Sequence, residues 1–172
     1  FVNNAGDVTV RVFALDGFPA DALEPFIRVN FGSGRSIDAV TILNGMPDRR
    51  FGVQIDGATV LQKFADQRRT DDGDLAFIVS DSRIESINLR YGISGENLNG
   101  FVLPGGLRFD ADIDGDNIVS DLTAVFVPAG NSNLFSVGGD LSGDALFLGG
   151  LNRVNVRGEV NNSDIRIGAG NL

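Results

Sequence analysis

The sequence predicts an all-β fold in which short parallel strands stack on one another as the coils of a β-solenoid. A short motif recurs: an aliphatic residue, a β-branched or aromatic residue three positions later, another aliphatic residue two positions on, and soon a glycine. Late in the chain the pattern returns after 19 residues, which suits one coil of short strands joined by glycine-bearing corners. The 23 glycines and the many β-branched residues also favour short strands and tight turns.

Several copies of the motif support this stacking. The clear copies occupy residues 37–42, 84–89 and 151–156, and they close at Gly45, Gly92 and Gly158. A fourth copy, weaker at its first position, centres on Phe135 and Val137, and residues 93–95 match residues 141–143. A repeated unit of this size cannot bury its apolar face alone, so we expect the copies to pack against one another.

The first part of the chain repeats poorly. Alternating apolar residues predict half-buried strands over residues 8–12 and 27–31, and a shorter strand over residues 53–55. One short helix is predicted over residues 58–68, because the apolar residues there fall at helical spacing. We therefore expect residues 1–74 to form an irregular β-rich unit or cap that contains this helix.

The second part of the chain, residues 75–172, is expected to hold the solenoid repeats. Motif copies that are 47 and 48 residues apart indicate coils with inserted loops. Residues 97–127 are interpreted as such an insertion, a long hairpin that turns at Asp114-Gly115. The alternative for the whole chain is an antiparallel β-sandwich whose strands share only a local pattern.

Charge and composition exclude several classes of function. The 14 basic and 23 acidic side chains give a net charge of −9, which disfavours nucleic acid and anionic membrane surfaces as partners. The longest apolar runs are too short for membrane insertion. The chain has no cysteine or histidine, so disulfides, thiol chemistry, His-based triads and the commonest zinc ligands are excluded. It begins with Phe1, which fits a processed signal peptide or an excised piece of a larger protein.

The sequence pattern of the repeats is similar to that of a known class of proteins. The stretches LSGD (141–144), GGLNRV (149–154) and VRGEV (156–160) resemble the repeat regions of large secreted bacterial β-solenoid proteins of the adhesin and cell-surface type. The resemblance covers roughly residues 75–172, from which residues 97–127 depart. It implies an extracellular or cell-surface location and a structural or adhesive role, with no universal active site. No functional residue is carried over.

An acidic segment in the expected insertion is the sharpest candidate for a ligand site. Its carboxylates alternate and are followed by a glycine, as in the front half of an EF-hand-like loop, so Ca²⁺ is a possible cofactor. The candidate ligands are Asp110, Asp112, Asp114, Asp116 and Asp121. The alternative is a plain hairpin whose carboxylates share the solvent face. Residues 71–74 form a weaker acidic turn.

Other charged residues are given structural interpretations. Asp38 and Glu85 hold equivalent places in two motif copies, and Asn155 is taken to replace them in a third, which favours a solvated face over a catalytic acid pair. The arginine pairs at residues 49–50 and 68–69 are interpreted as salt-bridged surface residues. We therefore expect no enzyme; carboxylate-based polysaccharide cleavage is the enzymatic alternative.

The functional prediction rests on the last residues of the repeat region. Residues 164–168 still follow the repeat and no polar capping segment comes after them. An open coil invites pairing with another chain, and the strand near residues 8–12 is a candidate to cover a neighbour's edge. We expect a structural subunit that binds itself end to end through this N-terminal strand and the exposed C-terminal coil, as a filament or surface layer. The alternatives are a polysaccharide-binding adhesin module, with glycans as partners, and the enzyme above.

Overall fold

The regular structure of the chain consists of β-strands. The computed structural model describes residues 7–10, 26–43, 50–69, 75–98, 122–127 and 130–168. The strands are β1 (Asp7–Val10), β2 (Phe26–Ile42), β3 (Phe51–Asp66), β4 (Leu75–Ser80), β5 (Arg83–Ile84), β6 (Ser86–Leu89), β7 (Thr123–Val127), β8 (Leu134–Val137), β9 (Leu141–Ser142), β10 (Asp144–Phe147), β11 (Val154–Val156), β12 (Val160–Asn161) and β13 (Ile165–Ile167). No helix occurs among these residues, so the predicted all-β class is confirmed.

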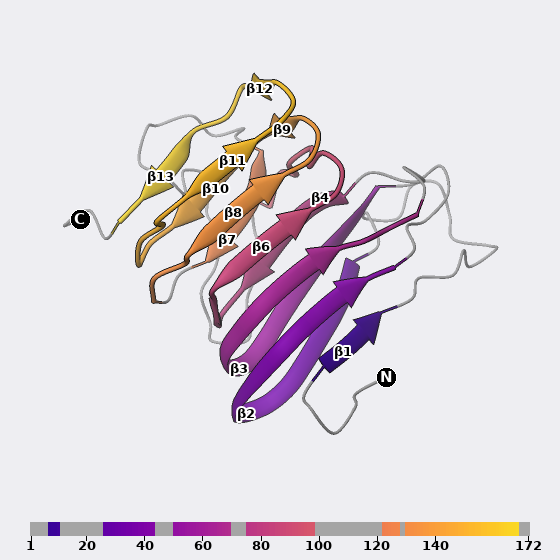
Figure 1. Ribbon diagram of the computed structural model, residues 1–172, viewed down its shortest axis with the longest axis vertical. Helices are drawn as coiled ribbons and strands as arrows, with labels where there is room; N and C mark the ends of the chain where they lie inside the picture. The colour runs from indigo at the N-terminus through magenta and orange to yellow at the C-terminus, as the bar shows by residue number, and fades with distance from the viewer. Residues whose placement is uncertain are drawn as a thin grey trace.

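The strands pair in parallel and form the faces of a β-solenoid. Face A contains the first part of β2, the first part of β3, and then β4, β7, β10 and β13. Face B contains β1, the second parts of β2 and β3, β5 with β6, β8 and β11. The short strands β9 and β12 form a narrow third face. Figure 1 shows β2, β3, β6, β8 and β11 as neighbouring arrows, with β1 and β13 toward opposite ends of the stack. Parallel pairing of this kind is that of a solenoid, and it rules out the antiparallel sandwich.

The motif copies stack in register on face B, as the sequence predicts. The second apolar position of the motif forms one column through the interior, in which each residue pairs with the next: Val40, Phe64, Ile87, Phe135 and Val154. The first four of these side chains are fully buried. Ser132 occupies the weak first position of the fourth copy, where its hydroxyl donates to the carbonyl of Ile84 at 2.6 Å.

The predicted helix over residues 58–68 is wrong. Residues 58–66 belong to β3 and supply a further copy of the motif on face B, with Leu61 paired to Ile37 and Ile84. The motif itself places apolar residues three positions apart, as Leu61 and Phe64 show, and this spacing is also that of a helix. Hydrogen bonds to strands on both sides outweigh the weak helical preference of so short a segment.

The predicted insertion is shorter than residues 97–127. Residues 123–127 form β7, which lies in face A between β4 and β10. Residues 99–121, including the predicted turn, lie outside the described residues. Every residue of β7 is buried, so its sequence lacks the alternation of a strand with one solvent face.

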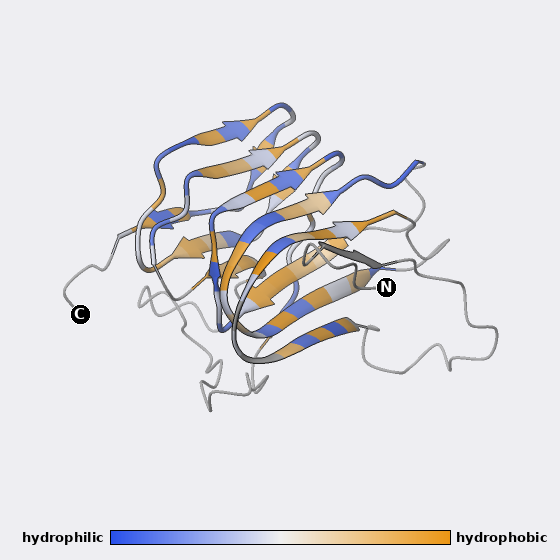
Figure 2. Cartoon of the chain, turned by 60° about the horizontal axis from the view of Figure 1, so that its bottom comes forward, coloured by the Kyte–Doolittle hydropathy of each residue, from blue (hydrophilic) through white to orange (hydrophobic). Residues whose placement is uncertain are grey.

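Face A is buried on both of its sides near the middle of the stack. Its inner side packs in the main core, whereas a second apolar cluster lies on its outer side. That cluster contains Val79, Phe126 and Leu146, which are consecutive partners in one outward column, together with Ala76, Phe77 and Leu98. Strands buried on both sides have near-continuous apolar sequences, and Figure 2 shows long hydrophobic stretches in this part of the stack.

A glycine that closes the motif stands where neighbouring coils meet at a corner. A side-chain carbon added to Gly139 would lie 2.7 Å from the backbone nitrogen of Gly92 on the adjacent coil. No ordinary Cβ contact is so short, so a larger residue would force the two backbones apart. This close approach is the physical reason for the glycine after the apolar part of the motif.

The strands before residue 74 continue the same stack. β2 and β3 belong to the 11-stranded sheet that also contains β6, β8 and β11. The division of the chain into units at residue 74 stays a prediction. No helix long and apolar enough to cross a membrane occurs in the described part of the chain.

Candidate functional site

The candidate calcium ligands cannot be placed. Asp110, Asp112, Asp114, Asp116 and Asp121 lie outside the described residues, as does the weaker acidic turn at residues 71–74. Among the residues that the structure describes, no group of three or more acidic, histidine or cysteine side chains could hold a metal ion. Calcium binding therefore stays a prediction from the sequence.

Asp38 and Glu85 lie in one column on the solvent side of face B. The backbone of Glu85 donates to Leu61, and Asn133 of the next coil donates to Glu85, so the column runs through all the coils. Its next member is Asn152, whose amide donates to Asn133 at 3.0 Å. The residue that replaces the two carboxylates in the third motif copy is thus Asn152. The prediction that Asn155 replaces them is wrong, because Asn155 lies three positions further along the copy and pairs with Ser136. Glu85 forms an ion pair with Arg83 at 3.1 Å.

Arg50 and Arg68, one from each arginine pair, have different environments, and Arg49 lies outside the described residues. Arg50 is partly exposed and forms an ion pair with Glu96 at 3.0 Å, as expected for a salt-bridged arginine. Arg68 is instead inside the solenoid, with a side-chain exposure of 1%. The prediction that Arg68 lies at the surface is wrong.

Arg68 is held in the core by a carboxylate and two aromatic rings. Its Nε atom lies 2.9 Å from Asp66, which occupies the inward column between Ile42 and Leu89. Its guanidinium carbon is 5.4 Å from the ring centroids of both Phe51 and Tyr91. A buried charge is tolerable only when it is paired and hydrogen-bonded, and here Asp66 also accepts the backbone N–H of Arg68. The signal in the sequence is an aspartate at the third motif position with an arginine two residues later.

A second buried carboxylate, Asp56, lies on the outer side of face A. Burial raises the pKa of Asp56, and the charge of Asp81 adds to this rise. Hydrogen bonds from Gln54 at 2.9 and 3.0 Å and the neighbouring Arg28 oppose it. The oxygen of the Gln54 side chain is buried and has no hydrogen-bond partner among the residues that the structure describes. This cluster ties the first two coils together on the side where later coils are apolar.

The two ends of the stack expose the core. Core residues in the middle coils are fully buried, whereas the partly buried apolar residues packed against them gather in the first and last coils. At the first coil they are Ile27, Val29 and Phe31, and at the last they are Leu151, Val154, Val156 and Ile165. Val160 and Ile167 of the last coil are 50% and 49% exposed. Within the described residues, each strand of the last coil pairs on one side only.

The two ends also have complementary steps. On face B the described stack begins with β1, one coil before the second part of β2. On face A it begins with the first part of β2 and ends with β13, one coil beyond β10. Face B therefore projects at the first end and face A projects at the last end.

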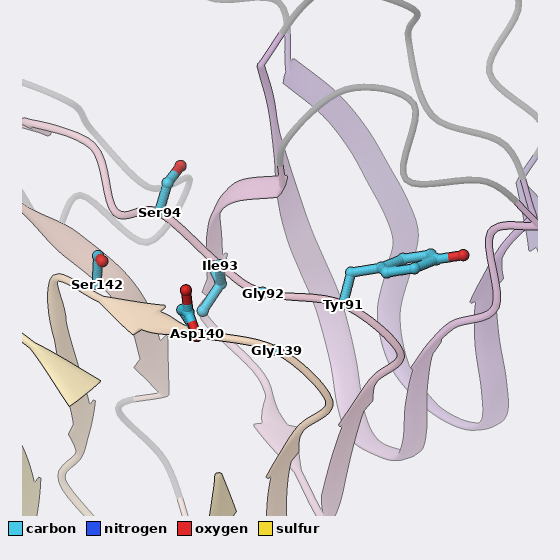
Figure 3. Close-up of a pocket in the computed structure, with 7 residues that line it drawn as sticks. All are labelled: Tyr91, Gly92, Ile93, Ser94, Gly139, Asp140 and Ser142. Carbon is cyan, nitrogen blue, oxygen red and sulfur yellow. The ribbon is translucent and has the colours of Figure 1, made fainter. Parts of the chain in front are cut away.

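A polar hollow lies on the third face, between two neighbouring coils. It has a volume of about 360 Å³ and is lined by Tyr91, Gly92, Ile93, Ser94, Gly139, Asp140 and Ser142. The pairing of Ile93 with Leu141 aligns the two walls, as the sequence match between these segments predicts. Figure 3 shows Ser94, Asp140 and Ser142 on one side of the hollow, with the ring of Tyr91 directed away from them.

Comparison with known proteins gives no relative for this chain. No protein-family model, no curated protein and no solved structure matches it. The solenoid fold therefore stands on the strand pairing alone, and the resemblance to secreted adhesin-type repeats stays an expectation.

Proposed function

We propose that the chain is a structural subunit that associates end to end, with the last coil of one copy stacked on the first coil of the next. The observation that carries this proposal is the pair of complementary steps, at which the partly buried core residues gather. A parallel strand with one free side is a template for another strand. The described strands at both ends run in the same direction, so a second copy could continue the stack.

The register of the stack specifies how face B would pair across the junction. Val8 and Val10 of β1 stand in the columns that end at Val154 and Val156 of β11. Thr9 stands in the column that ends at Asn155. Continuation would therefore pair the backbone of β1 with that of β11 in the register found between the coils of a single chain.

The register of face A specifies a second strip of the junction. Ile27 stands in the inward column that ends at Ile165, so these two isoleucines would meet inside. In the next column outward, Arg28 would face Arg166. Each of these arginines has its own carboxylate, Asp56 at 3.1 Å and Asp164 at 3.3 Å. The repulsion between these two like charges would weaken the junction, and substitution of either arginine tests this.

Contacts of this head-to-tail kind do not close on themselves unless the rotation forms a ring, so they produce filaments. A filament of stacked coils would be a fibrous or surface-layer element, which agrees with the resemblance to secreted cell-surface repeats. We place the protein outside the cell as part of the same proposal. Calcium bound by the aspartates near residue 112 would stabilise the subunit independently of the junction.

The experiment measures self-association by sedimentation velocity and electron microscopy over a range of concentrations. Wild-type chain is expected to form linear assemblies as the concentration rises. Arg166→Glu places a carboxylate opposite Arg28 and should tighten association several-fold, since cross-strand charge pairs are worth roughly 0.2–1 kcal/mol. The double variant Arg28→Glu, Arg166→Glu restores like charges and should lose this gain.

Arg157→Glu is the matched control, because it changes the net charge equally on the exposed corner of the last coil, away from the paired columns. It should leave association unchanged or slightly weaker. A chain that stays monomeric at its highest soluble concentration overturns the proposal. An equal response to Arg157→Glu and Arg166→Glu overturns the register.

A further inference from the structure

The hollow on the third face lies one coil before the last coil of the described stack, so a copy stacked on that last coil leaves it open. Its two walls come from residues 91–94 and from residues 139–142 of the next coil. The volume of about 360 Å³ lies in the lower part of the range of small-molecule sites, which is about 300–1,000 Å³. The chemistry of its walls indicates what it would bind.

Three side chains present unused hydrogen-bonding groups to the hollow. Ser94 Oγ accepts N–H groups of Arg50 at 3.0 and 3.3 Å, so its own O–H remains to donate elsewhere. Asp140 uses one carboxylate oxygen to accept the backbone N–H of Glu159 at 2.8 Å. Its second oxygen, and the hydroxyl of Ser142, have no partner among the described residues. The hollow therefore offers one strong acceptor and two hydroxyls on one side.

This set of groups fits the hydroxyls of a neutral sugar. A carboxylate accepts strong hydrogen bonds from hydroxyl groups, and serine hydroxyls both donate and accept. An anionic ligand is disfavoured by Asp140 and by the net charge of −9. A calcium ion takes 6–8 oxygen ligands, usually with several carboxylates, whereas this hollow holds one carboxylate.

The remaining walls let a ligand approach the backbone closely, but they offer no free aromatic ring for stacking. Gly92 and Gly139 carry no side chain, so a ligand can lie against the backbone there. The ring of Tyr91 is occupied, because the guanidinium groups of Arg68 and Arg90 lie 5.4 and 5.6 Å from its centroid. Its hydroxyl donates to the carbonyl of Arg69 at 3.2 Å. Recognition would thus depend on hydroxyl groups of the ligand and not on aromatic stacking.

The next coil repeats part of this polar set. Asn161 pairs with Ser142 and Val160 with Leu141, so Glu159 takes the position of Asp140 one coil further along. Glu159 and Asn161 are exposed. A ligand that extends from the hollow toward the last coil would meet the carboxylate of Asp140 and then that of Glu159. We propose that the third face binds a neutral oligosaccharide, with Asp140, Ser142 and Ser94 as the residues that contact its hydroxyls.

The test uses a panel of neutral oligosaccharides and the full chain, with binding followed by saturation-transfer NMR and titration calorimetry. Asp140→Asn keeps an oxygen for the Glu159 N–H but replaces the free carboxylate oxygen, so the fold should persist. This change is expected to weaken binding about tenfold, as for loss of a hydrogen bond to a charged group. Ser142→Ala should weaken binding by a smaller factor.

Asp38→Asn and Ser136→Ala are the controls, because both residues lie on face B and neither touches the hollow. Their sugar affinity should equal that of the wild type. Failure of every neutral oligosaccharide to bind overturns the proposal, as does binding that Asp140→Asn leaves unchanged. Binding of calcium chloride alone that Asp140→Asn abolishes would make the hollow a cation site and also overturn it. None of these outcomes depends on whether the chain forms filaments.

Discussion

The coil built from β3 and the coils that follow it fill the same inward position with different residues. In the later coils the third motif position holds Leu89, Val137 and Val156, which are apolar. In β3 it holds Asp66, and Arg68 is buried beside it. The difference teaches that the stack requires a filled and fully paired interior, and that an ion pair between aromatic rings can supply this in place of an aliphatic side chain.

The same comparison explains why the repeat is visible in one region and hidden in the other. After residue 130 the coils have short strands and tight corners, and register partners such as Ser136 and Asn155 are 19 residues apart. In the early coils β2 and β3 extend over 17 and 16 residues without a tight corner between faces. Extra residues are accommodated where these strands bend, so the number of residues between successive motif copies varies in this region.

The largest effect is expected from breaking the buried ion pair. Arg68→Met removes the cation and leaves Asp66 charged and unpaired in the core. Removal of one partner of a buried pair costs about 3–5 kcal/mol, so the free energy of unfolding should fall by that amount. Urea denaturation followed by circular dichroism measures the loss.

Two further variants sharpen this result. Asp66→Asn combined with Arg68→Met removes both charges and keeps an oxygen for the backbone N–H of Arg68. The double variant should recover at least half of the loss, because a neutral pair no longer leaves a buried ion. Arg69→Met, at an exposed neighbouring position, should change stability by less than about 0.5 kcal/mol. If Arg68→Met behaves like Arg69→Met, the ion pair does not stabilise the early coil as argued.

A second contrast concerns the corners of the two regions. Gly139→Ala would place a carbon 2.7 Å from the Gly92 backbone nitrogen, and overpacking of this kind costs about 1–3 kcal/mol. Gly34 in β2 has φ +87° with nothing within 4 Å of the added carbon, so Gly34→Ala should cost only the backbone strain, about 1 kcal/mol. Thermal unfolding of the two variants compares a tight corner with an open one. A larger loss for Gly34→Ala would show that the corners of the later coils are not tightly stacked.

The sequence predicts the fold correctly where the spacing of apolar residues indicates the same structure that the stacked coils adopt. Leu61 and Phe64 belong to a motif copy, but their spacing is common to strands in this solenoid and to helices, and only the neighbouring strands decide between the two. β7 was assigned to a hairpin because burial on both sides of face A removes the alternation that marks a strand. Tertiary cover on the outer side of a sheet leaves no local signal beyond a continuous apolar run.

The candidate sites were less predictable than the fold. The match of residues 93–95 to residues 141–143 identified two walls that the structure aligns around the hollow. The contacts that hold its polar side chains come partly from farther away, as with Arg50, which donates to Ser94 Oγ across 44 positions. The acidic composition predicts a salt-bridged surface position for Arg68, because its aromatic neighbours Phe51 and Tyr91 are distant from it in the sequence.

The smallest expected effect on stability concerns the outer side of face A, where the early and later coils also differ. One outward column is polar at Arg28 and Gln54 in the early coils and apolar at Val79, Phe126 and Leu146 in the later ones. The polar part surrounds Asp56, whose pKa burial raises above the ordinary value of 3.8. The folded chain then holds this proton at a pH at which the unfolded chain has released it. The contribution of Asp56 to stability therefore rises as the pH falls through the raised pKa toward 3.8.

Asp56→Asn isolates this contribution from that of the other carboxylates. The free energy of unfolding of the wild type, relative to Asp56→Asn, should increase as the pH is lowered from neutral, and urea denaturation at a series of pH values measures it. Asp81→Asn removes a charge that raises the pKa of Asp56, so the same increase should then begin at a lower pH. A difference between wild type and Asp56→Asn that stays constant with pH, or that falls on acidification, contradicts a raised pKa. It would mean that Arg28 and Gln54 compensate for the burial of the charge, and that the polar early coil is as fully paired as the ion pair of Asp66 and Arg68.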